Sequence, residues 1–236
     1  MKKQILSLSL LLFFGIGLCA QPKAVGEPKV IAKSNEPFTR PAWSPDGTKL
    51  MFTSLESNEL WEVSITGFNL RKVSTEAESQ LKATICTNPL YLQMIDNPMG
   101  VASKVEALKS LSGSIIYNPV LSPQKDKIVF QAHPGTGLYI CAADCQADAS
   151  TLRNFSQGER ACWTPDGKYL VAMIEGHDGT FITKGELISI DVASGAKSIL
   201  LSSDKYIALS PAISPDGKKL AFEDATGVIY IMDIQQ

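Results

Sequence analysis

Two histidines and two acidic residues of this chain have side chains suited to a metal site or to acid–base chemistry. His133 lies in the segment QAHPG, and His177 lies in EGHDG together with Glu175 and Asp178. Imidazole and carboxylate groups ligate metal ions, and histidine exchanges protons near neutral pH. These four side chains can act together only if the loops that carry them converge. The alternative is that exposed loops simply carry polar residues.

Two arginines form a second candidate set for binding a ligand or partner. Arg40 and Arg160 each stand directly before a short apolar strand pattern, at a position that Asn118 and Ser210 hold in related segments. Two guanidinium groups near one rim can bind a carboxylate through paired N–H donors. The alternative is that each guanidinium pairs with a neighbouring acid and holds only its own loop. The neighbouring acids are Glu36 and Glu159.

A recurring four-residue turn indicates which elements position these side chains. Ser-Pro-Asp-Gly occurs at residues 44–47 and 214–217, Thr-Pro-Asp-Gly at 164–167, and a degenerate copy at 122–126. Proline presets the first turn position, aspartate binds nearby backbone N–H groups, and glycine accepts a positive φ. Because each aspartate belongs to its own hairpin, we expect Asp46, Asp166 and Asp216 to have structural roles.

The spacing of these hairpins predicts an all-β, five-bladed β-propeller. Alternating apolar segments, typical of half-buried third strands, occur at residues 60–65, 91–95, 138–141, 187–192 and 229–234. Outer strands are expected at 70–73, 105–109, 152–155 and 197–201. The last blade lacks an outer strand, so we expect the N-terminal strand 29–33 to pair with 229–234 and complete it. Pairing of the two ends would remove exposed sheet edges.

Blade two departs from the pattern and is expected to be truncated. Only residues 77–87 precede its third strand, which leaves room for one strand at 81–87 and little for an innermost strand. Segment 101–111 also fits an amphipathic helix, with Val101, Val105, Leu108 and Leu111 on one face. We favour a strand there, because it aligns with 197–201 relative to the following blade.

The turn segments resemble the TolB-type, WD-like β-propeller repeat. The resemblance is carried by residues 42–52, 162–170 and 212–222, and it extends over most of 41–234. It implies the propeller fold and, together with export, a bacterial periplasmic location. Such repeats also occur in the propellers of prolyl-oligopeptidase-type peptidases and in oligogalacturonate lyases, so the resemblance does not specify an activity. TolB has a further N-terminal domain that this sequence lacks.

The N-terminus predicts export to the periplasm or beyond. A basic start at Lys2 and Lys3, an apolar run over 5–18 and a small residue before Gln21 are typical of a cleaved signal peptide. We therefore expect a signal peptide at 1–20 and a single domain at 21–236, with no membrane span. Leu18 stands where a lipobox has a small residue directly before its cysteine, Cys19, which argues against a lipoprotein. The formal net charge of −2 argues against nucleic acid as a partner.

Four cysteines remain after this cleavage, at positions 86, 141, 145 and 162. Export permits disulfides, and Cys141 and Cys145 could bridge locally, but buried thiols on strands are an equal alternative. The CxxxC spacing lacks a second ligand pair for zinc. We therefore expect no metal and no other cofactor.

The sequence thus favours a non-catalytic scaffold in the cell envelope that binds an envelope protein or peptide. It contains no Gly-x-Ser-x-Gly elbow and no hydrolase domain, which argues against a peptidase. The alternative is a carbohydrate-active enzyme, a glycosidase or lyase, with its site at the channel mouth and a small carbohydrate as ligand. The candidate binding residues are Arg40, Arg160, His133, His177, Glu175 and Asp178.

Overall fold

The strands of this protein form four antiparallel four-stranded sheets, in the part of the chain that the structure describes. The computed structural model describes residues 20–66, 69–73, 89–144 and 146–235. The first sheet, the β2–β5 blade, contains β2 (Phe38–Trp43), β3 (Lys49–Ser54), β4 (Leu60–Ser64) and β5 (Arg71–Lys72). The strands of this blade pair in chain order, from β2 to β5.

The other three blades repeat this order. The β6–β9 blade contains β6 (Ile115–Leu121), β7 (Lys127–His133), β8 (Tyr139–Ala142) and β9 (Arg153–Asn154), with the short 3-10 helix η2 (Ala149–Thr151) before its last strand. The β10–β13 blade contains β10 (Glu159–Trp163), β11 (Tyr169–His177), β12 (Ile182–Asp191) and β13 (Lys197–Leu201). The last blade contains β14 (Ala208–Ile213), β15 (Lys219–Asp224), β16 (Ile229–Gln235) and β1 (Lys23–Ala32).

The N-terminal strand completes the last blade, as the sequence predicted. β1 pairs antiparallel with β16, with Lys29 opposite Ile231 and Val30 opposite Tyr230. This sheet, the β14–β1 blade, is therefore built from both ends of the chain. The pairing supplies the outer strand that the C-terminal segment lacks, so the edge of β16 is covered.

The prediction of five blades was wrong, because the segment assigned to blade two is helical where the structure describes it. Residues 91–95 belong to α2 (Pro89–Asp96), and residues 105–109 fall largely in the 3-10 helix η1 (Glu106–Leu111), after α3 (Val101–Lys104). The predicted strand at 81–87 lies outside the described residues. The amphipathic alternative was the correct one for 101–111.

The spacing of apolar residues explains why this segment is helical. Leu90 and Met94 are buried four residues apart, whereas Leu92 and Ile95 between and after them are exposed. A strand would place residues 90, 92 and 94 on one face, whereas a helix places 90 and 94 on one face and turns 92 away from it. Further along, Val101, Val105, Leu108 and Leu111 are all buried. Burial of each such side chain contributes about 1.5–3 kcal/mol, so one helical face outweighs the weak strand pattern.

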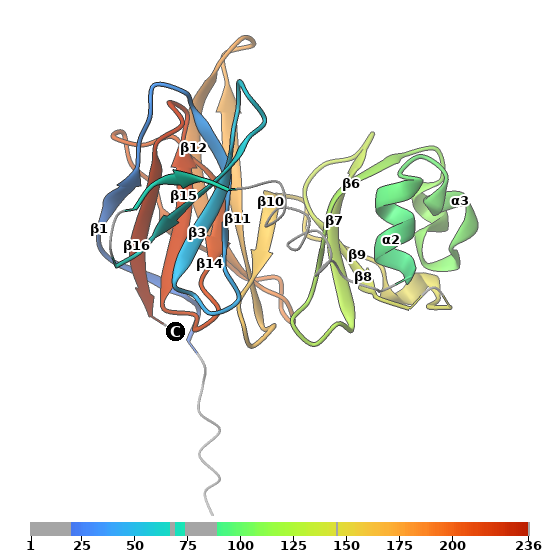
Figure 1. Ribbon diagram of the computed structural model, residues 1–236. Coiled ribbons are helices and arrows are strands. Elements are labelled where there is room, and N and C mark those ends of the chain that lie inside the picture. The colour runs from blue at the N-terminus through green and yellow to red at the C-terminus, as the bar shows by residue number, and fades with distance from the viewer. Residues whose placement is uncertain (1–19, 67–68, 74–88, 145, 236) are drawn as a thin grey trace, which may run out of the picture.

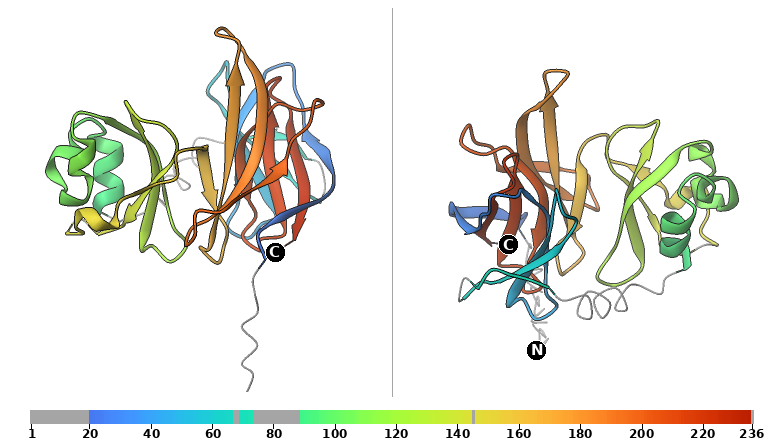
Figure 2. Two further views of the ribbon diagram at one scale, coloured as in Figure 1. Left: turned by 180° about the vertical axis from the view of Figure 1, so that it is seen from behind. Right: turned by 45° about the horizontal axis from the view of Figure 1, so that its top comes forward.

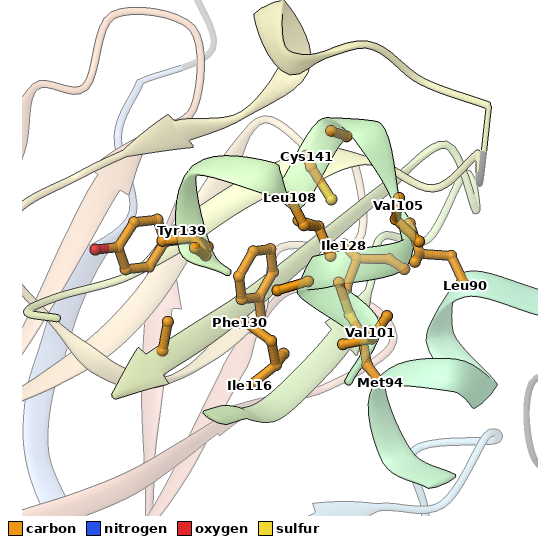
Figure 3. Packing of buried hydrophobic residues seen from close by; sticks show 14 of the residues in the cluster. Leu90, Met94, Val101, Val105, Leu108, Ile116, Ile128, Phe130, Tyr139 and Cys141 are labelled. Carbon is orange, nitrogen blue, oxygen red and sulfur yellow. The ribbon is translucent and has the colours of Figure 1, made fainter. Parts of the chain in front are cut away.

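The helices cover the face of the β6–β9 blade that is turned away from the other sheets (Figures 1 and 2). Figure 3 shows Leu108, Met94 and Val101 packed on side chains of the sheet, among them Phe130 and Ile116. The opposite face of this blade, with Val129 and its neighbours, packs on the β10–β13 blade. The helices therefore take the place of a further blade against this sheet.

The repeated turns form the hairpins that the sequence predicted. Asp46 accepts hydrogen bonds from Ser44 Oγ at 2.6 Å and from the Thr48 amide at 3.1 Å, and the turns at 164–167 and 214–217 have the same pattern. Gly47 has φ +69°. In the degenerate copy, Lys125 takes this left-handed position at φ 61°. The aspartates of these turns are structural.

Cys141 and Cys162 are free thiols, and burial raises the pKa of each to about 12. Such thiols are unreactive near neutral pH. Cys86 and Cys145 lie outside the described residues. Across the ranges that the structure describes, no helix has the length and apolar character needed to cross a membrane.

Candidate functional site

The innermost strands of all four blades line one pocket, and both candidate arginines belong to it. The pocket has a volume of about 510 Å³. Arg40 comes from β2 and Arg160 from β10, and the equivalent residues Asn118 and Ser210 come from β6 and β14. We call this cavity the two-arginine pocket. The sequence placed these four residues at one repeat position, and the fold brings them together around one cavity.

These four residues share an uncommon backbone conformation. Their φ angles are 55° at Arg40, 51° at Asn118, 45° at Arg160 and 44° at Ser210. In every blade the register between the first two strands shifts at this point, which is the pattern of a β-bulge. Positive φ is unfavourable for residues other than glycine, and most tolerable for asparagine. The bulge therefore imposes a strained conformation at the position that lines the pocket.

The backbone amide at this position is satisfied by the preceding blade. Three equivalent hydrogen bonds occur: from Arg40 N to Glu223 Oε2 at 3.0 Å, from Arg160 N to Gln131 Oε1 at 3.2 Å, and from Ser210 N to Met173 Sδ at 3.4 Å. The three acceptor residues hold the same position on the second strand of their blades. A side chain of one blade therefore holds the bulge of the next.

The guanidinium groups lack carboxylate partners among the described residues. Arg160 Nη1 donates to Ser210 Oγ at 2.9 Å, and no ion pair or hydrogen bond involves the Arg40 guanidinium within the same ranges. Glu36, the proposed partner of Arg40, instead accepts hydrogen bonds from the hydroxyl groups of Ser54 and Ser57. The pairing of Arg40 with Glu36 is therefore wrong, and Arg40 is free to meet an anion.

A second, smaller pocket of about 250 Å³ also includes both arginines. Its other lining residues come from β2, from β3 and from the loop after β3. They are Thr39, Thr53, Ser54, Leu55 and Asn58. This loop joins the second strand of the blade, β3, to the third, β4, so the pocket lies at that end of the blade. Hydroxyl and amide groups there can bind a ligand beside the arginines.

Glu175 and His177 are in hydrogen-bond contact at the end of β11. His177 Nε2 lies 2.8 Å from Glu175 Oε1. Glu159 of β10 pairs with Met173, two residues before Glu175, so the two glutamates are diagonal neighbours on one face of the sheet. Burial raises the pKa of Glu159 and the carboxylate of Glu175 raises it further, against the opposing effects of Gln131 and Arg160. Glu159 can therefore carry a proton at higher pH than an ordinary glutamate does.

The remaining candidates do not join this group. Asp178 accepts hydrogen bonds from the amides of Thr180 and Phe181, both at 2.8 Å, so it closes the β11–β12 turn. His133 ends β7 and is exposed, and no described interaction links it to His177. The segment that carries Glu175, His177 and Asp178, expected to be a loop, is instead mostly strand. β11 and β12 continue as a hairpin that projects beyond the neighbouring loops in Figure 1 (orange).

In the described part of the chain, no group of three or more histidine, cysteine or acidic side chains is arranged to hold a metal ion. His177 contacts Glu175. The chemistry that the described side chains of the site offer is anion binding by arginine and proton exchange by carboxyl groups.

Sequence reasoning missed Glu223, Gln131 and the acid–base environment of Glu159. A signal for the first two exists in the repeats: Phe222-Glu223 and Phe130-Gln131 follow the turn motif at the same distance. A polar residue directly after a buried phenylalanine, at a strand position where blades meet, indicates a contact between blades. Glu223 is only 3% exposed.

Comparison with known proteins gives matches only at the level of structure. No family model matches this chain, and no curated protein matches it. It is similar to the solved structure of a putative TolB from Agrobacterium tumefaciens, with 21% identity, a TM-score of 0.38, and coverage of 84% of this chain and 57% of the other. It is also similar to TolB from Acinetobacter baumannii, with 18% identity, a TM-score of 0.37, and coverage of 87% and 45%.

An oligogalacturonate lyase in complex with manganese is a further similar structure, with 15% identity, a TM-score of 0.36, and coverage of 89% of this chain and 52% of the lyase. The chain thus spans about half the length of these proteins.

Proposed function

We propose that this protein is an exported, non-catalytic binding module of the cell envelope, and that it holds a carboxylate-bearing peptide or protein segment at the two-arginine pocket. One observation carries the proposal: two guanidinium groups from separate blades line one cavity, and among the described residues neither has a carboxylate within ion-pair distance. Arginine on a rigid scaffold, held in a strained backbone conformation, is typical of a functional position.

The chemistry of the pocket favours a carboxylate as the recognised group. A guanidinium presents a planar set of N–H donors that matches the two oxygens of a carboxylate. Each charge-assisted hydrogen bond contributes about 1.5–3 kcal/mol. The Thr53 hydroxyl and the Asn58 side-chain amide in the adjoining pocket can bind backbone groups of the same peptide. A free C-terminal carboxylate is the simplest such ligand.

The periplasm is the proposed location. Support comes from the basic start and apolar run of residues 1–20, which lie almost entirely outside the described residues, and from the TolB-type repeat motif. An envelope protein or peptide is the corresponding class of partner.

Peptide binding tests the proposal. A library of labelled peptides with free C-terminal carboxylates is compared with the same peptides in amidated form, by fluorescence anisotropy. We expect amidation to weaken binding at least tenfold, and Arg40→Ala with Arg160→Ala to weaken it about a hundredfold. The matched control is Arg71→Ala with Lys72→Ala, which removes the same charge from the exposed strand β5. Equal binding by both double variants would overturn the proposal.

A second candidate function rests on Glu159 and Glu175. Two neighbouring carboxyl groups, one with a raised pKa, are the groups that a carbohydrate-active enzyme uses as acid and base. Release of reducing sugars from a glycan library tests this function. Turnover that is lost in both Glu159→Gln and Glu175→Gln would support the enzyme and replace the scaffold proposal. Absence of turnover in the intact protein would rule out this second candidate function.

A further inference from the structure

Glu223 of β15 is a buried carboxylate directly beside the two-arginine pocket. Its Oε1 accepts a hydrogen bond from Thr39 Oγ1 at 3.0 Å, and its Oε2 accepts one from the Arg40 amide at 3.0 Å. Burial raises the pKa of Glu223, against the opposing effects of the hydrogen bonds from Ser210, Thr39 and the Arg40 amide and of the Arg160 charge. Ser210 Oγ also accepts from Arg160 Nη1 at 2.9 Å. Glu223 therefore touches the backbone of one arginine and, through Ser210, the side chain of the other.

The equivalent residue between two other blades shows that this joint does not need a charge. Gln131 Oε1 accepts from the Arg160 amide, and also from Asn118 Nδ2 at 2.9 Å. A neutral amide thus satisfies the same bulge. Burial of a carboxylate is unfavourable unless cationic or hydrogen-bonding groups surround it. The presence of glutamate at position 223 therefore calls for a role beyond the hydrogen bond to the backbone.

We find that role in the effect of Glu223 on the positive potential of the pocket. The negative charge of Glu223 lies near the Arg160 guanidinium and directly behind the Arg40 backbone, so it reduces the positive potential that an incoming anion meets in the pocket. Because the Coulomb energy is proportional to the ligand's charge, this reduction weakens the binding of a dianion twice as much, in free energy, as the binding of a monoanion. The pocket then discriminates against phosphate-like groups and retains carboxylates.

We propose that Glu223 is a specificity-determining counter-charge that makes the two-arginine pocket selective for a monoanionic carboxylate over a dianion. This inference rests on the proposed function, because it concerns the same pocket. It assigns Glu223 two tasks: it positions the Arg40 backbone and the Ser210–Arg160 contact, and it lowers the affinity of the pocket for doubly charged ligands.

The test uses simple ions as probes of the purified protein. Sodium acetate and sodium phosphate are titrated at constant ionic strength and about pH 8, where phosphate is mostly a dianion. Binding is followed by the NMR signals of the arginine Nε–H groups, which are assigned with Arg40→Lys and Arg160→Lys. The proteins compared are the unsubstituted chain, Glu223→Gln and Glu27→Gln, the last being an identical charge change at an exposed site in β1.

Glu223→Gln should remain folded. Gln131 already makes the same backbone contact, and the hydroxyl groups of Thr39 and Ser210 can turn to accept hydrogen bonds from the new amide. A melting curve within a few degrees of the unsubstituted protein checks this. Gln131→Glu serves as a reciprocal variant, because it places an added carboxylate at the equivalent joint beside Arg160 and does not depend on the stability of Glu223→Gln.

We expect Glu223→Gln to increase acetate affinity about tenfold and phosphate affinity about a hundredfold, and Gln131→Glu to weaken phosphate more than acetate. Glu27→Gln should change neither affinity. Unchanged affinities in Glu223→Gln and in Gln131→Glu, with the arginine signals still responding to both ions, would overturn the counter-charge role and leave the proposed anion site intact. Absence of any response in the unsubstituted protein would overturn the anion site itself.

Discussion

The backbone amide of Arg40 donates a hydrogen bond to Glu223 Oε2 at 3.0 Å, although the two residues are 183 positions apart in the chain. The bond joins the β14–β1 blade to the β2–β5 blade. It also satisfies the amide of a bulge in which Arg40 has φ 55°. The arginine that faces the pocket is therefore held by a neighbouring blade rather than by its own strand.

Arg40→Asn should increase stability while it weakens anion binding. Asparagine tolerates positive φ better than arginine and already holds the equivalent position as Asn118. Relief of this strain should raise the free energy of unfolding by about 0.5–1 kcal/mol, measured by urea denaturation. Arg40→Lys is the control, because lysine at a positive φ is as strained as arginine and should not raise the free energy of unfolding. A loss of more than about 1 kcal/mol in Arg40→Asn would contradict the prediction.

Two tryptophans should stabilise the contacts between blades through their indole N–H groups. Trp43 Nε1 donates to the Ala212 carbonyl at 2.9 Å, and Trp163 Nε1 donates to the Val120 carbonyl at 3.1 Å. Replacement by phenylalanine loses one such bond and some packing, so each variant should lose about 1–2 kcal/mol of unfolding free energy.

Trp61 provides the matched control, because its Nε1 is the buried side-chain polar atom that lacks a partner within the described ranges. Trp61→Phe removes an unsatisfied donor, which offsets the lost packing. Its unfolding free energy should fall by less than that of Trp43→Phe or Trp163→Phe. Equal losses in all three variants, measured by urea denaturation, would show that the two hydrogen bonds contribute nothing specific.

Gly185 should not tolerate alanine, because the next blade approaches it closely. A Cβ there would lie 2.7 Å from the Ala208 carbonyl oxygen and 2.8 Å from the Ala208 nitrogen. Both are backbone atoms that cannot turn away, so Gly185→Ala should lose at least about 2 kcal/mol. Gly176→Ala, on the same hairpin, meets Lys184 Cβ at 3.3 Å and should lose less. A smaller loss at Gly185 would mean that the two blades can separate without penalty.

At low pH, the Asp46 turn should no longer contribute to the stability of the folded protein. The hydrogen bond from Ser44 Oγ, followed by those from Thr48, lowers the pKa of Asp46 from 3.8 to about 2. A carboxyl whose pKa is lower in the folded state stabilises the protein above its unfolded value and loses this effect as pH falls through about 2. The difference in melting temperature between the unsubstituted protein and Asp46→Ala should therefore narrow between about pH 4 and pH 2.

Ser44→Ala provides the comparison for this pH profile, because it removes the hydrogen bond that lowers the pKa of Asp46 most. The melting temperature of Ser44→Ala should become acid-sensitive at higher pH than that of the unsubstituted protein. A difference between the unsubstituted protein and Asp46→Ala that stays constant down to about pH 2 would show that the ionised carboxylate does not stabilise the turn.

The sequence by itself determined the features that depend on local patterns. The turn chemistry at residues 44–47, 164–167 and 214–217 set the hairpins, alternation set most third strands, and the missing outer strand of the last blade required the N-terminal strand to pair with β16. The repeat position of Arg40 and Arg160 was also visible, since it needed only alignment of the repeats. These signals act within a few residues or repeat at a fixed period.

The tertiary structure decided what depends on the neighbours of a segment. Residues 101–111 carry both a weak strand pattern and a helical face, and burial against the β6–β9 blade selected the helix. Because this segment is helical, the described residues form four blades and not the predicted five. Glu223 and Gln131 each accept a hydrogen bond from the backbone of the next blade. Local sequence patterns do not show which strand of another blade a polar side chain will contact. Asp178 lies apart from the candidate site because β11 and β12 continue as a hairpin where the sequence predicted a loop.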